Sequence, residues 1–243
     1  MGEQFLNAEV AGDGVATLIL NRPDKRNALS IALRDAVSDT LRAWVEDASV
    51  RVVVLTGAPP AFSAGFDLGE FGDPALARTI RHSSSRYHRA VWSFPKPIVA
   101  AVNGPALGGG FDLATLCDLR LASPEAVFGH PEIKFGAPPL FTPLRWIVGD
   151  GIARDLCLTG RRIDADDALR IGLVSRVVES SGLLDEARAV ARQIAEAPQR
   201  TLEATKRYLA ANQGFGFEDS FRIEHDDVFD NFLSGGVDAE GAG

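Results

Sequence analysis

The sequence is poor in cysteine and histidine, with two cysteines and four histidines among 243 residues. Cys117 and Cys157 both lie in apolar stretches that favour helix, so we interpret them as buried free thiols of a reducing compartment. This scarcity argues against a disulfide framework or a cysteine-rich metal site. His82 and His88 are six positions apart, which is not a spacing typical of metal ligands.

Positive charge and long apolar runs are also scarce. The formal net charge of −8 argues against a surface that binds nucleic acid or an anionic membrane. No apolar run approaches the roughly 18 residues of a membrane span, and the start at Met1–Gln4 lacks the basic region of a secretory signal. We therefore expect a cytoplasmic protein without nucleic-acid or membrane partners.

The remaining composition is that of an ordinary globular protein, with 46% hydrophobic and 24% charged residues. Strands alternate with helices in the first half, and helices dominate from about residue 144, which predicts the α/β class with a helical C-terminal part. A β-hairpin is predicted at 5–20 and further strands at 51–56, 98–102, 118–123 and 127–129. Helices are predicted at 30–47, 74–92, 144–148, 151–158, 165–171, 184–197, 201–211 and 217–232, before a glycine-rich tail that we expect to be mobile.

The stretch 98–114 is the most informative part of the chain. A buried strand is followed by the break Asn103–Pro105, by three glycines at 108–110 and by an apolar helical run. A glycine-rich helix start directs free backbone N–H groups toward a ligand, so an anion or a developing oxyanion is the expected guest. The glycine spacing does not match a dinucleotide fingerprint, and Phe111 stands near where a nucleotide triphosphatase needs lysine. A helix packed tightly on a strand, without a ligand, explains the same glycines.

Two other motifs have weaker interpretations. The run Ala61–Gly65 differs from a nucleophile elbow because Ala61 replaces the first glycine, which disfavours a serine hydrolase. His130 stands two residues before Glu132 and could touch a site there, but we interpret it as a packed, hydrogen-bonded histidine.

Four separated stretches, taken together, resemble the enoyl-CoA hydratase/isomerase (crotonase) superfamily. They are Leu20–Leu29, Phe62–Leu68, Val102–Asp112 and Phe128–Glu132, with a weaker fifth match in Thr159–Ile163 and Gly172–Val174. The resemblance implies a crotonase-like core of ββα spiral turns over residues 1–190 and a helical C-terminal oligomerisation region over 191–243. It also implies a homotrimer or a dimer of trimers.

The resemblance implies that an acyl-CoA thioester reacts through an enolate-like state. Backbone N–H groups of Phe66 and Gly109 would then form the oxyanion hole. Many relatives have alanine where this chain has Phe66, so the ring narrows the site. Asp112 and Glu132, twenty positions apart, fall at the two carboxylate positions of hydratases, although Asp112 replaces the usual glutamate. Two close carboxylates raise one pKa toward neutrality, which suits general acid–base work.

The resemblance also implies which residues contact coenzyme A. Lys25 and Arg26 are the candidates for its phosphates, although a solvated turn explains either residue equally well. The other positions implied to bind substrate are Ala28, Ala64, Asp67, Leu68 and Gly108. We expect no metal, flavin or nicotinamide cofactor, with the coenzyme A thioester as substrate.

The sequence therefore predicts a hydratase of the C2–C3 double bond of a 2-enoyl-CoA. One alternative is a 3-enoyl-CoA to 2-enoyl-CoA isomerase that relies on Glu132. The segment Gly136–Phe141 favours this alternative, because it is apolar and contains prolines where hydratases usually have a glycine-rich loop. A dienoyl-CoA isomerase would need a third carboxylate where Leu140 stands. An alternative of another class is a non-catalytic acyl-CoA-binding protein, which would need neither carboxylate.

Overall fold

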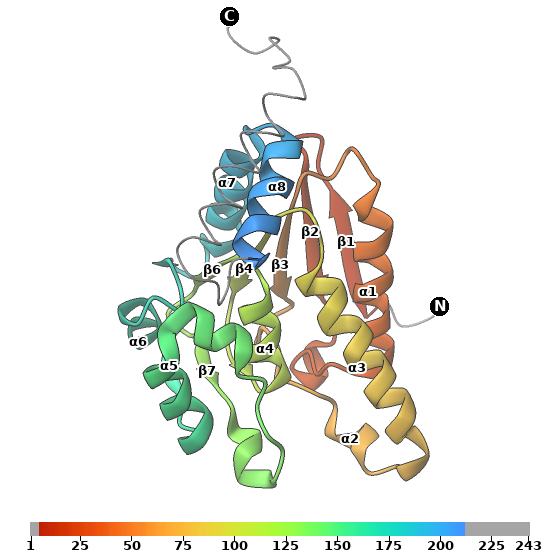
Figure 1. Ribbon diagram of the computed structural model, residues 1–243, viewed down its shortest axis with the longest axis vertical. Coiled ribbons are helices and arrows are strands. Elements are labelled where there is room, and N and C mark those ends of the chain that lie inside the picture. Colours follow the sequence, from red (N-terminus) through yellow and green to blue (C-terminus); the bar gives the residue numbers. More distant parts are fainter. Residues whose placement is uncertain (1–4, 212–243) are drawn as a thin grey trace, which may run out of the picture.

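A six-stranded sheet forms the centre of the molecule, seen in a computed structural model that describes residues 5–211. The strand order is β1-β2-β3-β4-β6-β9, and only β1 runs antiparallel to its neighbour (Figure 1). The strands are β1 (Leu6–Val10), β2 (Val15–Leu20), β3 (Val52–Gly57), β4 (Ile98–Val102), β6 (Leu119–Ala122) and β9 (Arg176–Val177).

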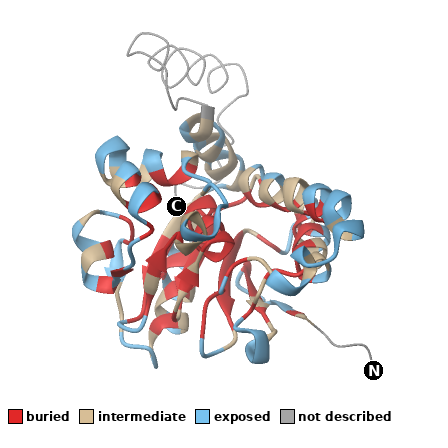
Figure 2. Ribbon diagram, turned by 90° about the horizontal axis from the view of Figure 1, so that it is seen from below, coloured by how far each residue is buried: buried red, intermediate tan, exposed pale blue. Residues whose placement is uncertain are grey.

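Helices cover both faces of this sheet. Side chains alternate between the faces of a strand, so neighbouring residues of β3 contribute to two separate cores. On one face pack α1 (Ile31–Val45), α3 (Ala77–Trp92) and α4 (Gly109–Leu116), and on the other α7 (Leu183–Ala195). Figure 2 shows the buried strands between helices whose outer faces are exposed. Because both faces are covered, the central strands β3 and β4 are buried along their whole length and are largely apolar.

A second, three-stranded sheet extends the core toward the site described below. Its order is β5-β7-β8, with β5 (Ala106–Leu107), β7 (Val127–Gly129) and β8 (Ile163–Asp164). The helical elements around the two sheets are η1 (Pro23–Lys25), α2 (Leu68–Phe71), η2 (Pro74–Leu76), η3 (Pro131–Phe135), α5 (Thr142–Thr159), α6 (Ala165–Arg170) and α8 (Gln199–Ala211). The short β5 leads directly into α4 and thereby fixes where the glycine-rich turn lies.

Most predicted elements are confirmed, including the hairpin of β1 and β2 and the α/β class. The two helices predicted at 144–148 and 151–158 form one element, α5, which is broken at Gly149 by a non-helical φ of 78°. The predicted helix 217–232 and the tail lie outside the described residues. The predicted domain boundary after residue 190 falls inside α7, whose buried residues on both sides of it pack on the sheet.

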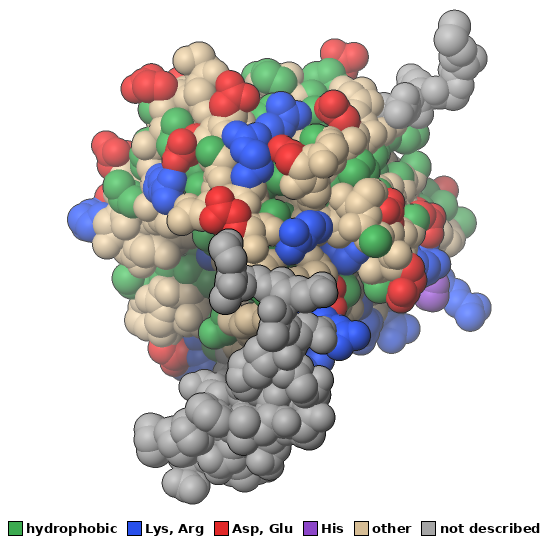
Figure 3. All heavy atoms as spheres, turned by 90° about the horizontal axis from the view of Figure 1, so that it is seen from above, with side chains coloured by type: hydrophobic (Ala, Val, Ile, Leu, Met, Phe, Trp, Pro, Cys, Tyr) green, Lys and Arg blue, Asp and Glu red, His purple; other side chains and the backbone are tan. Residues whose placement is uncertain are grey.

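Two surface properties complete the description. In the described part of the chain, no helix combines the length and the apolar character needed to cross a membrane. Figure 3 shows cationic and anionic side chains interspersed on the face seen from above.

Candidate functional site

Two glycine-containing turns lie against each other at the start of α4. Leu107 N donates to Ser63 O at 3.0 Å, so the residues before both turns run side by side. Gly65 has a φ of +93°, and a Cβ added to it would fall 2.7 Å from Leu107 O and 3.2 Å from the Gly109 nitrogen. Only glycine accommodates both the positive φ and this close approach. The Phe66 and Gly109 turns are therefore held next to each other by backbone geometry.

Two amides of these turns, those of Phe66 and Gly109, have no acceptor within the described structure. Gly109 is the first residue of α4, and the first N–H groups of a helix lack an intrahelical acceptor. Neither the Phe66 N–H nor the Gly109 N–H donates to a backbone or side-chain acceptor among residues 5–211. These two groups, which the sequence singled out, are available to bind a ligand oxygen.

Asp112 and Glu132 approach the same turn from two elements. Asp112 lies in the first turn of α4, and Glu132 lies in η3. The Glu132 carboxylate lies over Gly108, since a Cβ added there would fall 3.1 Å from Glu132 Oε2. His130 Nδ1 is 2.8 Å from Glu132 Oε1 and 3.8 Å from Asp112 Oδ1. The structure thus brings together the two carboxylates that are twenty positions apart in the sequence.

The electrostatics of this pair favour one bound proton. Burial raises the pKa of Asp112 well above its ordinary value, and the charge of Glu132 raises that pKa further. Asp112 Oδ1 and Glu132 Oε2 are buried and have no hydrogen-bond partner among the described residues. Two carboxyl groups that share a proton and keep free oxygens can take a proton from one atom and give one to another.

The Phe66 side chain forms a wall beside the two amides. Its ring stacks on His88 at 6.1 Å and meets the edge of Phe71 at 6.0 Å between ring centroids. The Arg34 guanidinium lies 4.7 Å from the Phe66 ring centroid. Phe66 also lines a hollow of about 360 Å³, whose other lining residues are Phe71, Asp73, Pro74, Ala77, Ile80, Arg81 and Ser84.

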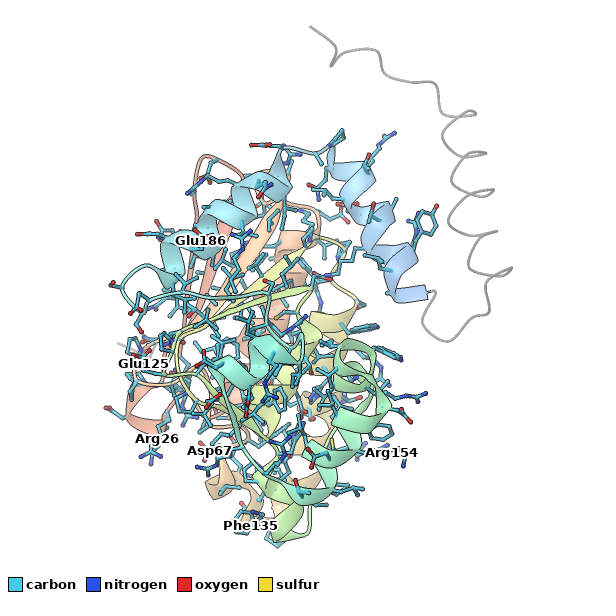
Figure 4. All side chains as sticks on the ribbon, turned by 90° about the vertical axis from the view of Figure 1, so that its left-hand side faces the viewer. Arg26, Asp67, Glu125, Phe135, Arg154 and Glu186 are labelled. Atoms are coloured by element: carbon cyan, nitrogen blue, oxygen red, sulfur yellow. The ribbon has the colours of Figure 1, made fainter. Side chains whose placement is uncertain are left out.

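The predicted coenzyme A contacts lie on the loops next to this wall. The buried Asn27 side chain donates to Ala58 O at 2.8 Å and to Ala61 O at 2.7 Å, which fixes the loop that carries the exposed Lys25 and Arg26. Figure 4 shows Arg26 and Asp67 at the same end of the molecule.

The remaining predicted contacts follow the Phe66 turn or pair with it. Ala64 is exposed, and its N–H donates to Arg26 O at 2.9 Å. The Asp67 carboxylate forms an ion pair with Arg22 at 3.0 Å, and the half-buried Ala28 accepts from the same arginine. Leu68 is 82% exposed. These contacts connect the loop of residues 22–28 to the turn that carries Phe66.

The structure places two further side chains beside the site. His130 is fully buried and contacts Glu132 directly, and its position two residues before Glu132 was the available signal. Arg34 is also fully buried, and it donates to Leu29 O and to Ser83 Oγ. Nothing in the sequence around Arg34 indicated that the side chain would be buried and hydrogen-bonded there.

The two cysteine thiols are kept unreactive by burial. Burial raises the pKa of Cys117 to about 12 and that of Cys157 to about 11, so both stay protonated thiols at neutral pH. Between residues 5 and 211, no group of three or more His, Cys, Asp or Glu side chains could hold a metal ion.

Comparison with known proteins places the chain in a family. The sequence model of the enoyl-CoA hydratase/isomerase family matches residues 11–232. The 2,3-dehydroadipyl-CoA hydratase of Escherichia coli is 39% identical over 202 residues, which cover 82% of this chain and 79% of that protein. The crotonyl-CoA hydratase of Syntrophomonas wolfei is 37% identical over 206 residues, covering 82% of this chain and 78% of that protein.

A solved structure agrees with these sequence matches. The crystal structure of an enoyl-CoA hydratase from Bacillus anthracis has a TM-score of 0.89 and 32% identity, and covers 95% of this chain and 92% of that one. The fold is therefore that of the crotonase superfamily, as the resemblance implied. The chain belongs to the enoyl-CoA hydratase/isomerase family of enzymes.

Proposed function

We propose that this protein adds water across the C2–C3 double bond of a 2-enoyl-CoA. The observation that carries the proposal is the pair Asp112 and Glu132, each with a buried oxygen that has no partner, beside the Gly108 turn. Relatives named as crotonyl-CoA and 2,3-dehydroadipyl-CoA hydratases support the same reaction class. A protein that only binds acyl-CoA has no use for two carboxyl groups that each keep a buried oxygen without a partner among the described residues.

The Phe66 and Gly109 amides hold the thioester oxygen in this mechanism. Attack of water at C3 moves electrons to that oxygen and creates an enolate. Two preorganised N–H donors stabilise the developing charge, by about 3–4 kcal/mol per donor in comparable sites. Both amides are free of other acceptors among the described residues, which supports this role.

The carboxyl groups move the protons. The ionised carboxyl takes a proton from the water as the C3–O bond forms, and the protonated one gives its proton to C2 as the enolate collapses. One proton enters the pair and one leaves it, so the pair binds the same number of protons before and after the reaction. The raised pKa of Asp112 favours its protonated form, which is the form that a general acid needs.

The test is turnover of short- and medium-chain 2-enoyl-CoA by the wild type, by Glu132→Gln and by Asp112→Asn, with a 3-enoyl-CoA in parallel. We expect the wild type to consume 2-enoyl-CoA and each variant to lose about 10²–10⁴-fold in kcat. Acyl-CoA binding, measured by calorimetry, should remain in both variants because neither carboxylate holds the coenzyme.

Two outcomes would contradict hydration. Conversion of only the 3-enoyl substrate, with Asp112→Asn still active, would establish an isomerase that relies on Glu132. Binding without turnover of either substrate would establish a non-catalytic acyl-CoA-binding protein.

Lys25 and Arg26 are proposed to hold the coenzyme phosphates, supported by their exposure on a fixed loop that is hydrogen-bonded to Ala64. Replacing either by alanine should raise KM and leave kcat unchanged.

A trimeric assembly is proposed as well, supported by exposed apolar side chains on η3 and α5 such as Phe135 and Leu158, at 84% and 72% exposure. Light scattering of the purified protein tests the assembly.

A further inference from the structure

His130 is a buried, titratable group that the mechanism above does not use. It lies between β7 and η3 and is fully buried. Its ring packs on Phe111 of α4, with 4.7 Å between the ring centroids and 33° between the planes. A histidine placed only to fill the core could be oriented in many ways, but this one directs a single nitrogen at both carboxylates.

That nitrogen is Nδ1, which is 2.8 Å from Glu132 Oε1 and 3.8 Å from Asp112 Oδ1. Only the contact with Glu132 is short enough for a hydrogen bond. The other ring nitrogen, Nε2, is buried and has no partner among residues 5–211. One proton must lie between Nδ1 and Glu132, either on the nitrogen or on the carboxyl oxygen.

The surroundings favour the proton on the nitrogen. The Glu132 side chain is 24% exposed and that of Asp112 only 8%, so ionisation is less costly at Glu132. Tyr87 interacts electrostatically with Asp112, and Cys157 interacts with both carboxyl groups. Burial is the main reason that Tyr87 and Cys157 have raised pKa values and stay neutral. An N–H that donates to a carboxylate forms a charge-assisted hydrogen bond, which is stronger than a neutral one.

We propose that His130 is a positioning residue whose neutral Nδ1–H donates to Glu132, keeps Glu132 ionised with Oε2 over Gly108, and leaves the pair's proton on Asp112. This inference rests on the proposed function in one respect, because it makes Glu132 the base toward water and Asp112 the acid toward C2. The site of the proton itself is independent of the reaction.

Two amide variants separate this role from packing. The asparagine side-chain nitrogen of His130→Asn occupies about the place of Nδ1, whereas the longer His130→Gln places its nitrogen about where Nε2 lies. His130→Asn should keep kcat within about tenfold of the wild type. His130→Gln should lose roughly ten- to hundredfold in kcat with KM unchanged, as expected for the loss of a hydrogen bond to a charged group.

The pH profile is the readout that a packing role would not move. Loss of the Nδ1–H donor raises the pKa of a carboxylate that it stabilised. The acidic limb of kcat/KM should therefore shift to higher pH in His130→Gln and return toward the wild type in His130→Asn. Equal kcat values for the two variants, or an acidic limb that stays in place, would overturn the proposal.

A measurement without turnover separates this inference from the hydratase proposal. Nitrogen-15 NMR of the wild-type imidazoles reports which ring nitrogen carries the proton, and the His130 signal is the one missing in His130→Gln. We expect the Nδ1–H tautomer in the wild type at neutral pH. An Nε2–H tautomer, or a doubly protonated ring, would overturn the proposal even if hydration is observed. The Nδ1–H tautomer in a protein that hydrates nothing would refute only the function.

Discussion

The ring of Phe66 lies directly on Gly109: a Cβ added to Gly109 would fall 2.6 Å from Phe66 Cδ2 and 2.7 Å from Cε2. The free amides belong to the backbone of Phe66 and Gly109. The Phe66 ring therefore packs on Gly109 while both N–H groups stay available to a ligand. Phe66 therefore shapes the space around the proposed oxyanion hole while its own amide contributes to that hole.

Phe66→Ala should change acyl-chain selectivity. Removing the ring opens the hollow beside Phe71 and Ile80, and each additional buried CH₂ is worth about 0.8 kcal/mol. We expect kcat/KM for medium-chain 2-enoyl-CoA to rise several-fold relative to the short-chain substrate. The ratio of medium-chain to short-chain kcat/KM in Phe66→Leu, which keeps an apolar wall, should lie between those of the wild type and Phe66→Ala. A selectivity ratio that is the same in all three would contradict this function of the ring.

Gly110→Ala should destabilise the protein. A Cβ at Gly110 would fall 2.3 Å from the backbone oxygen of Ser63, which cannot move without displacing the turn before Phe66. Overpacking of this kind costs about 1–3 kcal/mol. Gly12→Ala is the control, since no atom lies within 4 Å of a Cβ there, and it should change stability by less than about 0.5 kcal/mol. Urea unfolding compares the two, and equal stability would disprove the close packing.

Asp112→Asn should raise thermal stability at neutral pH while it lowers activity. An acid whose pKa is higher in the folded than in the unfolded state binds more protons when folded. Its contribution to stability is therefore lost as pH rises above the unfolded value of about 3.9. Asparagine does not ionise, so the variant's melting temperature should exceed that of the wild type at pH 7, by an amount that shrinks toward pH 4.

The exposed Asp24 provides the control for this experiment. Asp24→Asn removes the same charge from the surface and should leave the pH dependence of the melting temperature close to that of the wild type. A difference between Asp112→Asn and wild type that grows on acidification would have the wrong sign for a buried acid and would refute the explanation.

Arg34→Met should cost about 3–5 kcal/mol. The buried guanidinium donates to Leu29 O and lies 3.7 Å from Glu70. Methionine leaves Leu29 O without this donor and removes the positive charge beside Glu70, which keeps only the Ile31 N–H among the described residues. Arg42→Met is the control, because Arg42 is 68% exposed and its pair with Asp39 is worth less than about 1 kcal/mol. Denaturant unfolding of both variants measures the difference. Similar losses in the two variants would show that Arg34 is not a structural anchor of the site.

Local patterns were enough to predict the main elements. The alternation around Gly12–Gly14 predicted the hairpin, and Ser30 predicted the start of α1, where its side chain accepts from Leu33 N. The three glycines predicted a close-packed helix start, because glycine by itself indicates that another backbone can approach closely. The three shortest strands, β5, β8 and β9, were not predicted, because two residues are too few to show a period.

By itself, the sequence determined the α/β class, the glycine turn and, through the family's motifs, the candidate residues Asp112 and Glu132. Only the tertiary structure decided what surrounds them: His130 Nδ1 within 3.8 Å of both carboxylates, and Arg34 beneath the Phe66 ring. The physical reason is that helix and strand formation depends on neighbours along the chain. The protonation and orientation of a buried side chain depend instead on groups that folding brings from other elements.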